Sequence, residues 1–161
     1  MNAPTEEPEN TPHLRWSSLE QSARAYYRAT PMERIRIIKS RVPAKFVTVM
    51  SLRMKIPREK LYSSLNLARA TIDRKVRKEE LLSQDESERV LGVARLVGQA
   101  ETIVKESGNA EGFNPSEWVA GWLQHPHAAL GGKSPAELMD TGDGRELVAD
   151  LLARQQSGAY T

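Results

Sequence analysis

The sequence predicts an all-α protein, and three observations lead to this prediction. Several segments begin with a Ser, Thr, Asn or Asp followed three residues later by Glu, which is the pattern of a helix capping box. Apolar residues after these starts recur at intervals of three and four, as they do on one face of a helix. Alternating apolar and polar residues, which would indicate strands, are scarce. We therefore expect a series of short helices.

The N-terminal part is expected to hold a tail and a helical extension. Residues 1–13 are polar and rich in Pro and Glu, so they predict a disordered tail. Residues 14–41 predict two helices, the second of which begins with Thr30 as its cap and Pro31 at its first position. Its inner face is expected to be Ile35, Ile38 and Val42.

Residues 42–106 are typical of a helix-turn-helix domain. Two helices that begin at prolines are followed by a short turn and by a third helix from Arg69 to Lys78. Asn66 stands in the turn, where the backbone needs a residue that tolerates positive φ. A capping box at Ser83 then opens a long apolar helix that reaches about Ser107.

The third helix has the distribution of charge expected of a helix that lies in the major groove of DNA. Its inner face is expected to be Ile72 and Val76. The candidate DNA-binding residues, left for its outer faces and far end, are Arg69, Thr71, Arg74, Lys75, Arg77 and Lys78. Ala68, where a capping Ser or Thr is more usual, and Asp73, whose carboxylate would repel phosphate, depart from the usual pattern. They bear on base preference more than on the fold.

The charge of the 161 residues is divided unevenly along the chain. Residues 1–12 carry −3, residues 13–82 carry +11 and residues 83–161 carry −6, although the whole chain carries only +2. This division predicts a middle portion that meets a polyanion and a C-terminal portion that does not. A merely solvated basic surface is the alternative interpretation.

Residues 107–161 are expected to form a small helical domain. Its core is expected to include Trp118, Trp122, Leu130 and Leu138. A short second helix opens at the cap Ser134 and is expected to end at Gly142. Asp143 and Glu146 are expected to cap the last helix, with Leu147, Val148, Leu151 and Leu152 as its apolar stripe.

The composition and motifs indicate neither a membrane protein nor an enzyme. The chain has no cysteine, no apolar run near the roughly 18 residues of a spanning helix and no signal-peptide pattern, so we expect a cytoplasmic protein. Residues 131–134 (GGKS) resemble the end of a phosphate-binding loop, but His127 stands where that loop requires glycine. His125 and His127 flank a proline and lack the i, i+4 spacing of a helical metal site. We expect no catalytic residue, no metal and no cofactor.

The last third of the chain carries the blocks WL, ALGGKSP, DTGDGRELV and LL at fixed spacing. In this it resembles the toxin-binding domain of the Xre/ParS/MbcA antitoxins, which neutralise RES-domain toxins. The segment LNLARATIDRKV is similar to the turn and recognition helix of Xre- or Cro-like regulators. The resemblance implies an antitoxin of a type II toxin–antitoxin system. The charge division and the helix pattern add the expectation that it also represses its own operon. RES toxins are similar in fold to ADP-ribosyltransferases and are associated with consuming NAD, so the inhibited partner would be an NAD-degrading enzyme.

The expected partners are the cognate RES-domain toxin, operator DNA and a second copy of the chain within a hetero-oligomeric complex. The candidate toxin-binding residues are Asp140, Asp143, Arg145, Glu146, Asp150, Arg154, Tyr160 and Thr161. The acidic side chains would meet the cations of an NAD pocket. The C-terminal tail with its aromatic ring would plug that pocket. Alternatively, the folded domain would cover the pocket entrance. Two alternatives stay open, a stand-alone regulator whose C-terminal domain mediates self-association and an adaptor without DNA binding.

Overall fold

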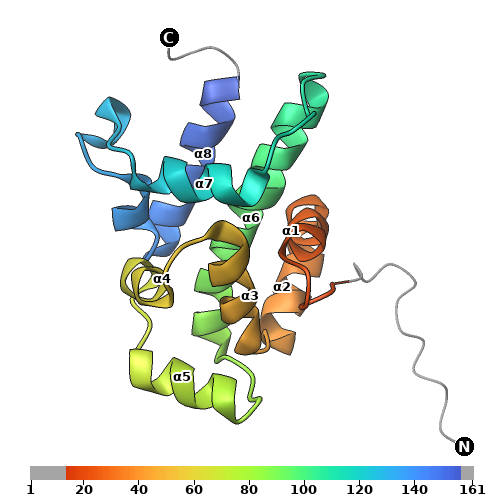
Figure 1. Ribbon diagram of the computed structural model, residues 1–161, viewed down its shortest axis with the longest axis vertical. Helices are drawn as coiled ribbons and strands as arrows, with labels where there is room; N and C mark the ends of the chain where they lie inside the picture. Colours follow the sequence, from red (N-terminus) through yellow and green to blue (C-terminus); the bar gives the residue numbers. More distant parts are fainter. Residues whose placement is uncertain (1–13, 157–161) are drawn as a thin grey trace, which may run out of the picture.

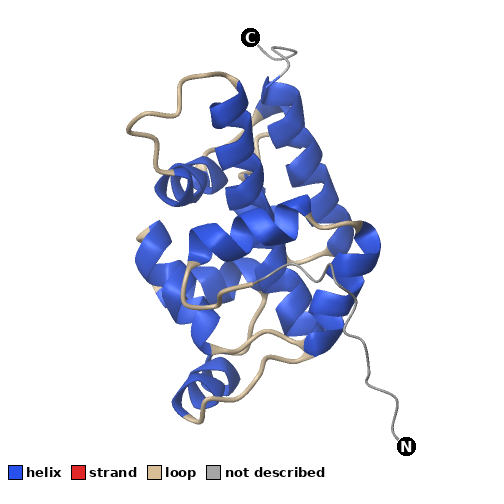
Figure 2. Ribbon diagram, turned by 90° about the vertical axis from the view of Figure 1, so that its right-hand side faces the viewer, coloured by secondary structure: helices blue, strands red, loops and turns tan. Residues whose placement is uncertain are grey.

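The computed structural model describes residues 14–156, which form short helices packed around one long central helix (Figure 1). Within this range the regular elements are helices (Figure 2), and Pro43 and Leu81 form an isolated bridge. The predicted all-α class is confirmed. The tail predicted for residues 1–13, and Tyr160 and Thr161 at the other end, lie outside the described residues. The helices are α1 (Leu19–Arg28), α2 (Pro31–Ser40), α3 (Lys45–Met54), α4 (Arg58–Leu65), α5 (Arg69–Arg77), α6 (Gln84–Glu106), α7 (Pro115–Gln124), the 3-10 turns η1 (Ala128–Leu130) and η2 (Pro135–Leu138), and α8 (Gly142–Gln156).

The central helix is α6, because apolar residues cover much of its circumference and α1, α7 and α8 all pack on it. It begins at the predicted capping box, in which the Glu86 N–H donates to Ser83 Oγ at 3.1 Å and the Ser83 N–H donates to Glu86 Oε1 at 2.7 Å. At Gly98 it lies directly against α1, since a Cβ there would stand 2.8 Å from the carbonyl carbon of Ala23. Gly98 therefore lets α6 and α1 approach closely.

Helices α3, α4 and α5 build the predicted helix-turn-helix portion. Asn66 ends α4 in the left-handed conformation, with φ 52° and ψ 49°, as its place in the turn predicts. The core of this portion includes Leu65 and Ile72, which are fully buried. The hydroxyl of Tyr62 donates to Asp73 Oδ1 at 2.8 Å and so links α4 to α5.

The expected inner face of α2 is partly wrong. Ile35 is 43% exposed, and Ile37 is the buried isoleucine of this helix. Isoleucines at 35, 37 and 38 leave the phase of the helix undetermined by periodicity alone. The phase follows from Arg34, whose guanidinium donates to the carbonyls of Tyr26 and Tyr27 and lies over the Tyr26 ring.

The start of α8 also differs from the expectation. The short turn η2 ends at Leu138, and Gly142 is the first residue of α8 instead of the end of the preceding helix. Thr141 caps α8: its Oγ1 accepts from the Gly144 N–H at 3.0 Å, and its carbonyl accepts from the Arg145 N–H. Asp143 therefore lies inside the helix, and Leu147 is 45% exposed instead of belonging to the apolar stripe.

Candidate interaction surfaces

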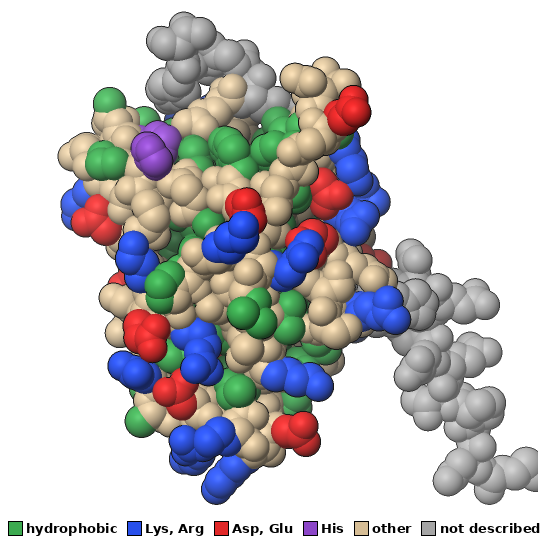
Figure 3. Space-filling model, viewed as in Figure 1, with side chains coloured by type: hydrophobic (Ala, Val, Ile, Leu, Met, Phe, Trp, Pro, Cys, Tyr) green, Lys and Arg blue, Asp and Glu red, His purple; other side chains and the backbone are tan. Residues whose placement is uncertain are grey.

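The outer face of α5 is the candidate surface for DNA. Arg74, Arg77 and Lys78 are exposed, as predicted, and Figure 3 shows Lys and Arg side chains gathered at the end of the molecule that α5 forms. Ala70 is exposed one turn before Arg74. Ala70 was not among the residues predicted for the outer face, although an inward Ile72 fixes the phase of the helix and places Ala70 on the outside.

Two of the predicted DNA-binding cations are already engaged within the chain. Arg69 is exposed but lies 3.3 Å from Glu59 and 3.8 Å from Asp73. Lys75 is a correction: its side chain is only 13% exposed, and its ammonium donates to Glu86 Oε1 at 2.6 Å. Thr71 is half-buried. Lys75 therefore anchors α5 to the start of α6 and does not face outward.

The contact between Lys75 and Glu86 affects the ionisation of the carboxyl group. Burial of Glu86 opposes its ionisation, but hydrogen bonds from Lys75 and from Ser83 outweigh this and hold its pKa below the ordinary value. On the other side of α5, burial and the hydrogen bond to Asp73 raise the pKa of Tyr62 to about 12. The recognition helix is thus held from both neighbours by polar contacts as well as by Ile72.

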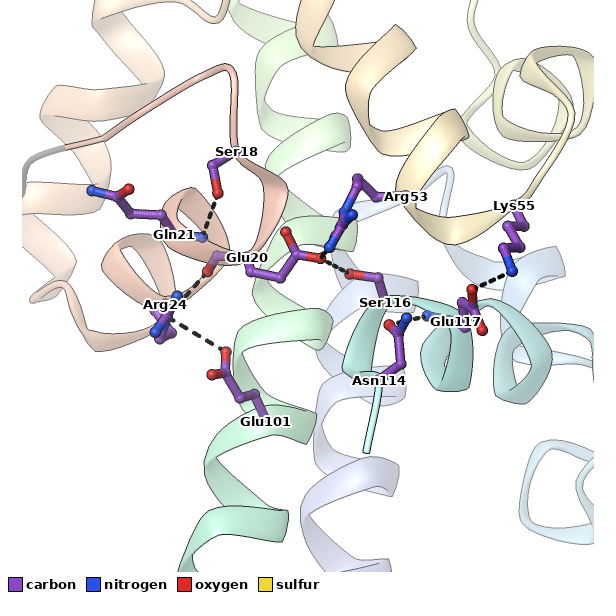
Figure 4. A network of polar contacts seen from close by, with 10 residues as sticks. All are labelled: Ser18, Glu20, Gln21, Arg24, Arg53, Lys55, Glu101, Asn114, Ser116 and Glu117. Atoms are coloured by element: carbon purple, nitrogen blue, oxygen red, sulfur yellow. Dashed lines mark hydrogen bonds and ion pairs between the residues drawn. The ribbon is translucent and has the colours of Figure 1, made fainter. Parts of the chain in front are cut away.

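A polar network joins the helix-turn-helix portion to the C-terminal helices (Figure 4). Glu20 of α1 accepts from Arg53 of α3 at 2.8 Å and from Ser116 of α7 at 3.2 Å. Burial opposes the ionisation of Glu20, yet these hydrogen bonds keep its pKa below the ordinary value. Lys55 and Glu117 add an ion pair of 2.7 Å between α3 and α7. Together with the continuous α6, these contacts join the two portions directly.

The candidate toxin-binding acids gather on one side of α8. Asp143, Glu146 and Asp150 are exposed at intervals of three and four residues, and Arg154 follows on the same face. Asp140 is exposed just before the helix. Glu146 pairs with Arg95 of α6 at 2.8 Å.

Arg145 does not belong to this acidic stripe. It is half-buried on the inner side of α8, and its guanidinium donates to the carbonyl of Met139 at 3.0 Å. Met139 is itself almost fully buried, a core residue that sequence reasoning missed. Arg145 therefore has a structural role between η2 and α8.

The tryptophans of α7 divide between core and surface. Trp122 is buried, and its indole N–H donates to Gln155 Oε1 at 2.9 Å. Trp118 stacks on Trp122 with ring centroids 6.0 Å apart, but it is 41% exposed, so its assignment to the core is wrong. It borders an apolar cleft of about 210 Å³, lined also by Ile103, Val104, Phe113 and Leu152 of neighbouring elements.

Two comparisons with known proteins bear on these surfaces. The family described as the antitoxin Xre/MbcA/ParS C-terminal toxin-binding domain matches residues 99–158, and the family described as the antitoxin Xre-like helix-turn-helix domain matches residues 33–95. The "Prs ADP-ribosylating antitoxin" of Sphingobium sp. (strain YBL2) is 42% identical over 137 residues, which cover 85% of this chain and 86% of that protein. This protein belongs to the Xre/MbcA/ParS antitoxin family.

The membership gives this antitoxin a helix-turn-helix domain and a toxin-binding domain, and it implies a cognate toxin and DNA as partners. The two matched ranges meet inside α6, between residues 95 and 99, and not in a loop. Among residues 14–156, no helix is long and apolar enough to cross a membrane. Within the same range, no cluster of three or more His, Asp or Glu side chains could hold a metal ion.

Proposed function

We propose that this antitoxin neutralises a RES-type toxin that degrades NAD and that it represses its own operon through α5. The single observation that carries the proposal is the pairing, on one body, of an exposed basic face on α5 with the toxin-binding range that contains the acidic stripe of α8. The two surfaces use different residues, so DNA and toxin need not compete for the same side chains. The name of the Sphingobium relative connects that protein with ADP-ribosylation, a reaction that consumes NAD, and supports a toxin of this chemistry.

The acidic stripe suits a partner whose substrate is anionic. A pocket that accepts the pyrophosphate of NAD needs cations at its mouth. The side chains that would meet those cations are exposed: Asp140, Asp143, Glu146 and Asp150. These charges would speed association and fix the register more than add affinity. The proposal includes a plug of the pocket by the C-terminal residues Tyr160 and Thr161.

A co-expression experiment tests the proposal on the toxin. The toxin encoded beside this antitoxin's gene is expressed alone and with the antitoxin, while growth and cellular NAD are measured. We expect NAD to fall with the toxin alone and to recover with the antitoxin. Recovery of growth without any fall of NAD would refute the NAD-degrading chemistry. Failure to restore growth would refute neutralisation.

A truncation separates the plug from coverage by the folded domain. Removal of residues 157–161 keeps Gln155, which holds Trp122, so the shortened protein keeps this contact. If the tail is the plug, the truncated antitoxin still binds DNA but no longer protects cells from the toxin. Full protection by the truncated protein would assign inhibition to the folded domain.

Gel shifts with the DNA upstream of the operon test repression. Arg74→Ala removes an exposed cation of the recognition face, and we expect a loss of about 1–3 kcal/mol of binding free energy together with a shallower salt dependence. Protection from the toxin should persist in this variant. Unchanged DNA affinity for Arg74→Ala and Arg77→Ala together would remove the outer face of α5 from DNA recognition.

A further inference from the structure

Gly121 is a helix-interior glycine that no contact within residues 14–156 explains. An added Cβ at Gly92, Gly98 or Gly144 would collide with a side chain or with backbone of another element, so each of these glycines allows a close approach inside the fold. At Gly121 the same atom would meet nothing within 4 Å. Glycine weakens a helix interior relative to alanine, so the fold loses stability at Gly121 without an internal contact that requires it.

The surface around Gly121 has the form of an anchor between two grooves. Trp118 lies one turn before it and is 41% exposed. Trp118 lines the apolar cleft of about 210 Å³ and also a groove of about 360 Å³ formed with Glu117, Gly121, Trp122 and His125. Exposed tryptophans beside such pockets are typical centres of protein interfaces.

The electrostatics of this face suit an apolar partner. The carboxylate of Glu117 is paired with Lys55 at 2.7 Å, which offsets its charge. His125 Nδ1 lies 2.8 Å from the Gly121 carbonyl, so this carbonyl already has a side-chain partner within the chain. The groove between Trp118 and His125 is mostly apolar in its lining.

The geometry points to this α7 face, made of Trp118, Gly121 and the two grooves, as the surface on which an apolar segment of the cognate toxin docks. The backbone of that segment comes close to Gly121, where a methyl group would separate the two chains, and its aliphatic side chains fill the grooves beside Trp118. The face lies wholly within residues 99–158, the toxin-binding match, and this selects the toxin as occupant over a second copy. The inference rests on the proposed function and adds an apolar anchor to the acidic stripe of α8.

Titration calorimetry with the purified toxin encoded by the neighbouring gene tests the inference. Gly121→Ala should raise the Tm of the free antitoxin by roughly 2–4 °C, because helix propensity improves and no atom is displaced. The same variant should bind the toxin at least tenfold more weakly, and Trp118→Ala should bind about 30-fold more weakly or worse. Leu52→Ala, which truncates a 72% exposed leucine of α3, is the matched control and should bind within twofold of the parent.

The outcomes separate this inference from the proposed function. Lack of binding by the parent protein would overturn the proposed function itself. Parent-like binding by both Gly121→Ala and Trp118→Ala would overturn only the α7 face. A change in the mass of the free antitoxin in Trp118→Ala, with toxin affinity unchanged, would assign the face to a second copy and overturn the inference. A last outcome combines two results: removal of residues 157–161 shifts the tryptophan emission, and Trp118→Ala binds the toxin as the parent does. This outcome would assign the α7 face to the chain's own C-terminus and would also overturn the inference.

Discussion

Replacement of Gly98 by alanine should destabilise the antitoxin, although alanine is the better helix former. The gain in helix propensity is about 1 kcal/mol. Against it, the new methyl group would meet the carbonyl oxygen of Ala23 and would stand 2.8 Å from its carbonyl carbon and 2.8 Å from Tyr27 Cβ. Backbone atoms in the middle of α1 cannot rotate away, so α1 must shift from α6.

The size of the effect follows from these opposing contributions. Overpacking costs typically about 1–3 kcal/mol, and a backbone contact places Gly98→Ala at the upper end of that range. The net loss is therefore about 2 kcal/mol, which for a protein of this size lowers Tm by roughly 4–8 °C. Urea unfolding followed by circular dichroism measures the free energy of unfolding, and calorimetry measures Tm.

Two matched glycines serve as controls for Gly98→Ala. Gly121→Ala should be stabilising, because the added methyl group meets nothing within 4 Å. Gly92→Ala should cost less than Gly98→Ala, because its contact is a methylene of the Arg145 side chain and not backbone, although a shift of that side chain strains its hydrogen bond to the Met139 carbonyl. If Gly98→Ala were as stable as the parent protein, α1 could not pack on α6 in the described register, and the argument for close helix approach would fail.

Three further predictions concern the core and the polar contacts. Trp122→Ala should cost about 3–5 kcal/mol of unfolding free energy, because it removes a buried indole and the partner of Gln155; a parent-like urea midpoint would contradict this. Lys75→Ala should lower stability by about 1–3 kcal/mol while Arg74→Ala leaves it within about 0.5 kcal/mol, since only Lys75 leaves a partly buried carboxylate without its partner. The Tyr62→Phe variant should lose less stability above pH 10 than the parent protein. The Tyr62 hydroxyl, whose pKa is raised to about 12 in the folded state, contributes stability that is present below pH 10 and is lost as the pH rises through about 12. Unfolding curves of parent and variant that stay parallel from pH 9 to 12 would refute it.

The lowered pKa of Glu86 gives stability with the opposite pH dependence. Its contribution is present above the ordinary carboxyl pKa of 4.5 and is lost as pH falls through the lower pKa of the folded state. Acid unfolding of Glu86→Gln should therefore be flatter below about pH 4.5 than that of the parent.

The helical class, the order of the helices and the turn of the helix-turn-helix portion could all be predicted from the amino-acid sequence. Capping boxes at Thr30 and Ser83 and the left-handed Asn66 were predictable because each depends on residues three or four positions away. The exposed basic face of α5 was predictable for the same reason. Once Ile72 lies inside, the geometry of a single helix places Arg74, Arg77 and Lys78 outside.

Tertiary structure alone decided which residues of each helix meet a neighbour. Lys75 faces inward because Glu86 lies on α6. Trp118 is exposed because the elements around α7 cover Trp122 much more fully than Trp118. Ile37 replaces Ile35 in the core because Arg34 fixes the rotation of α2 through the carbonyls of α1. These outcomes depend on contacts between separate elements, and periodicity within one helix carries no information about where another helix lies.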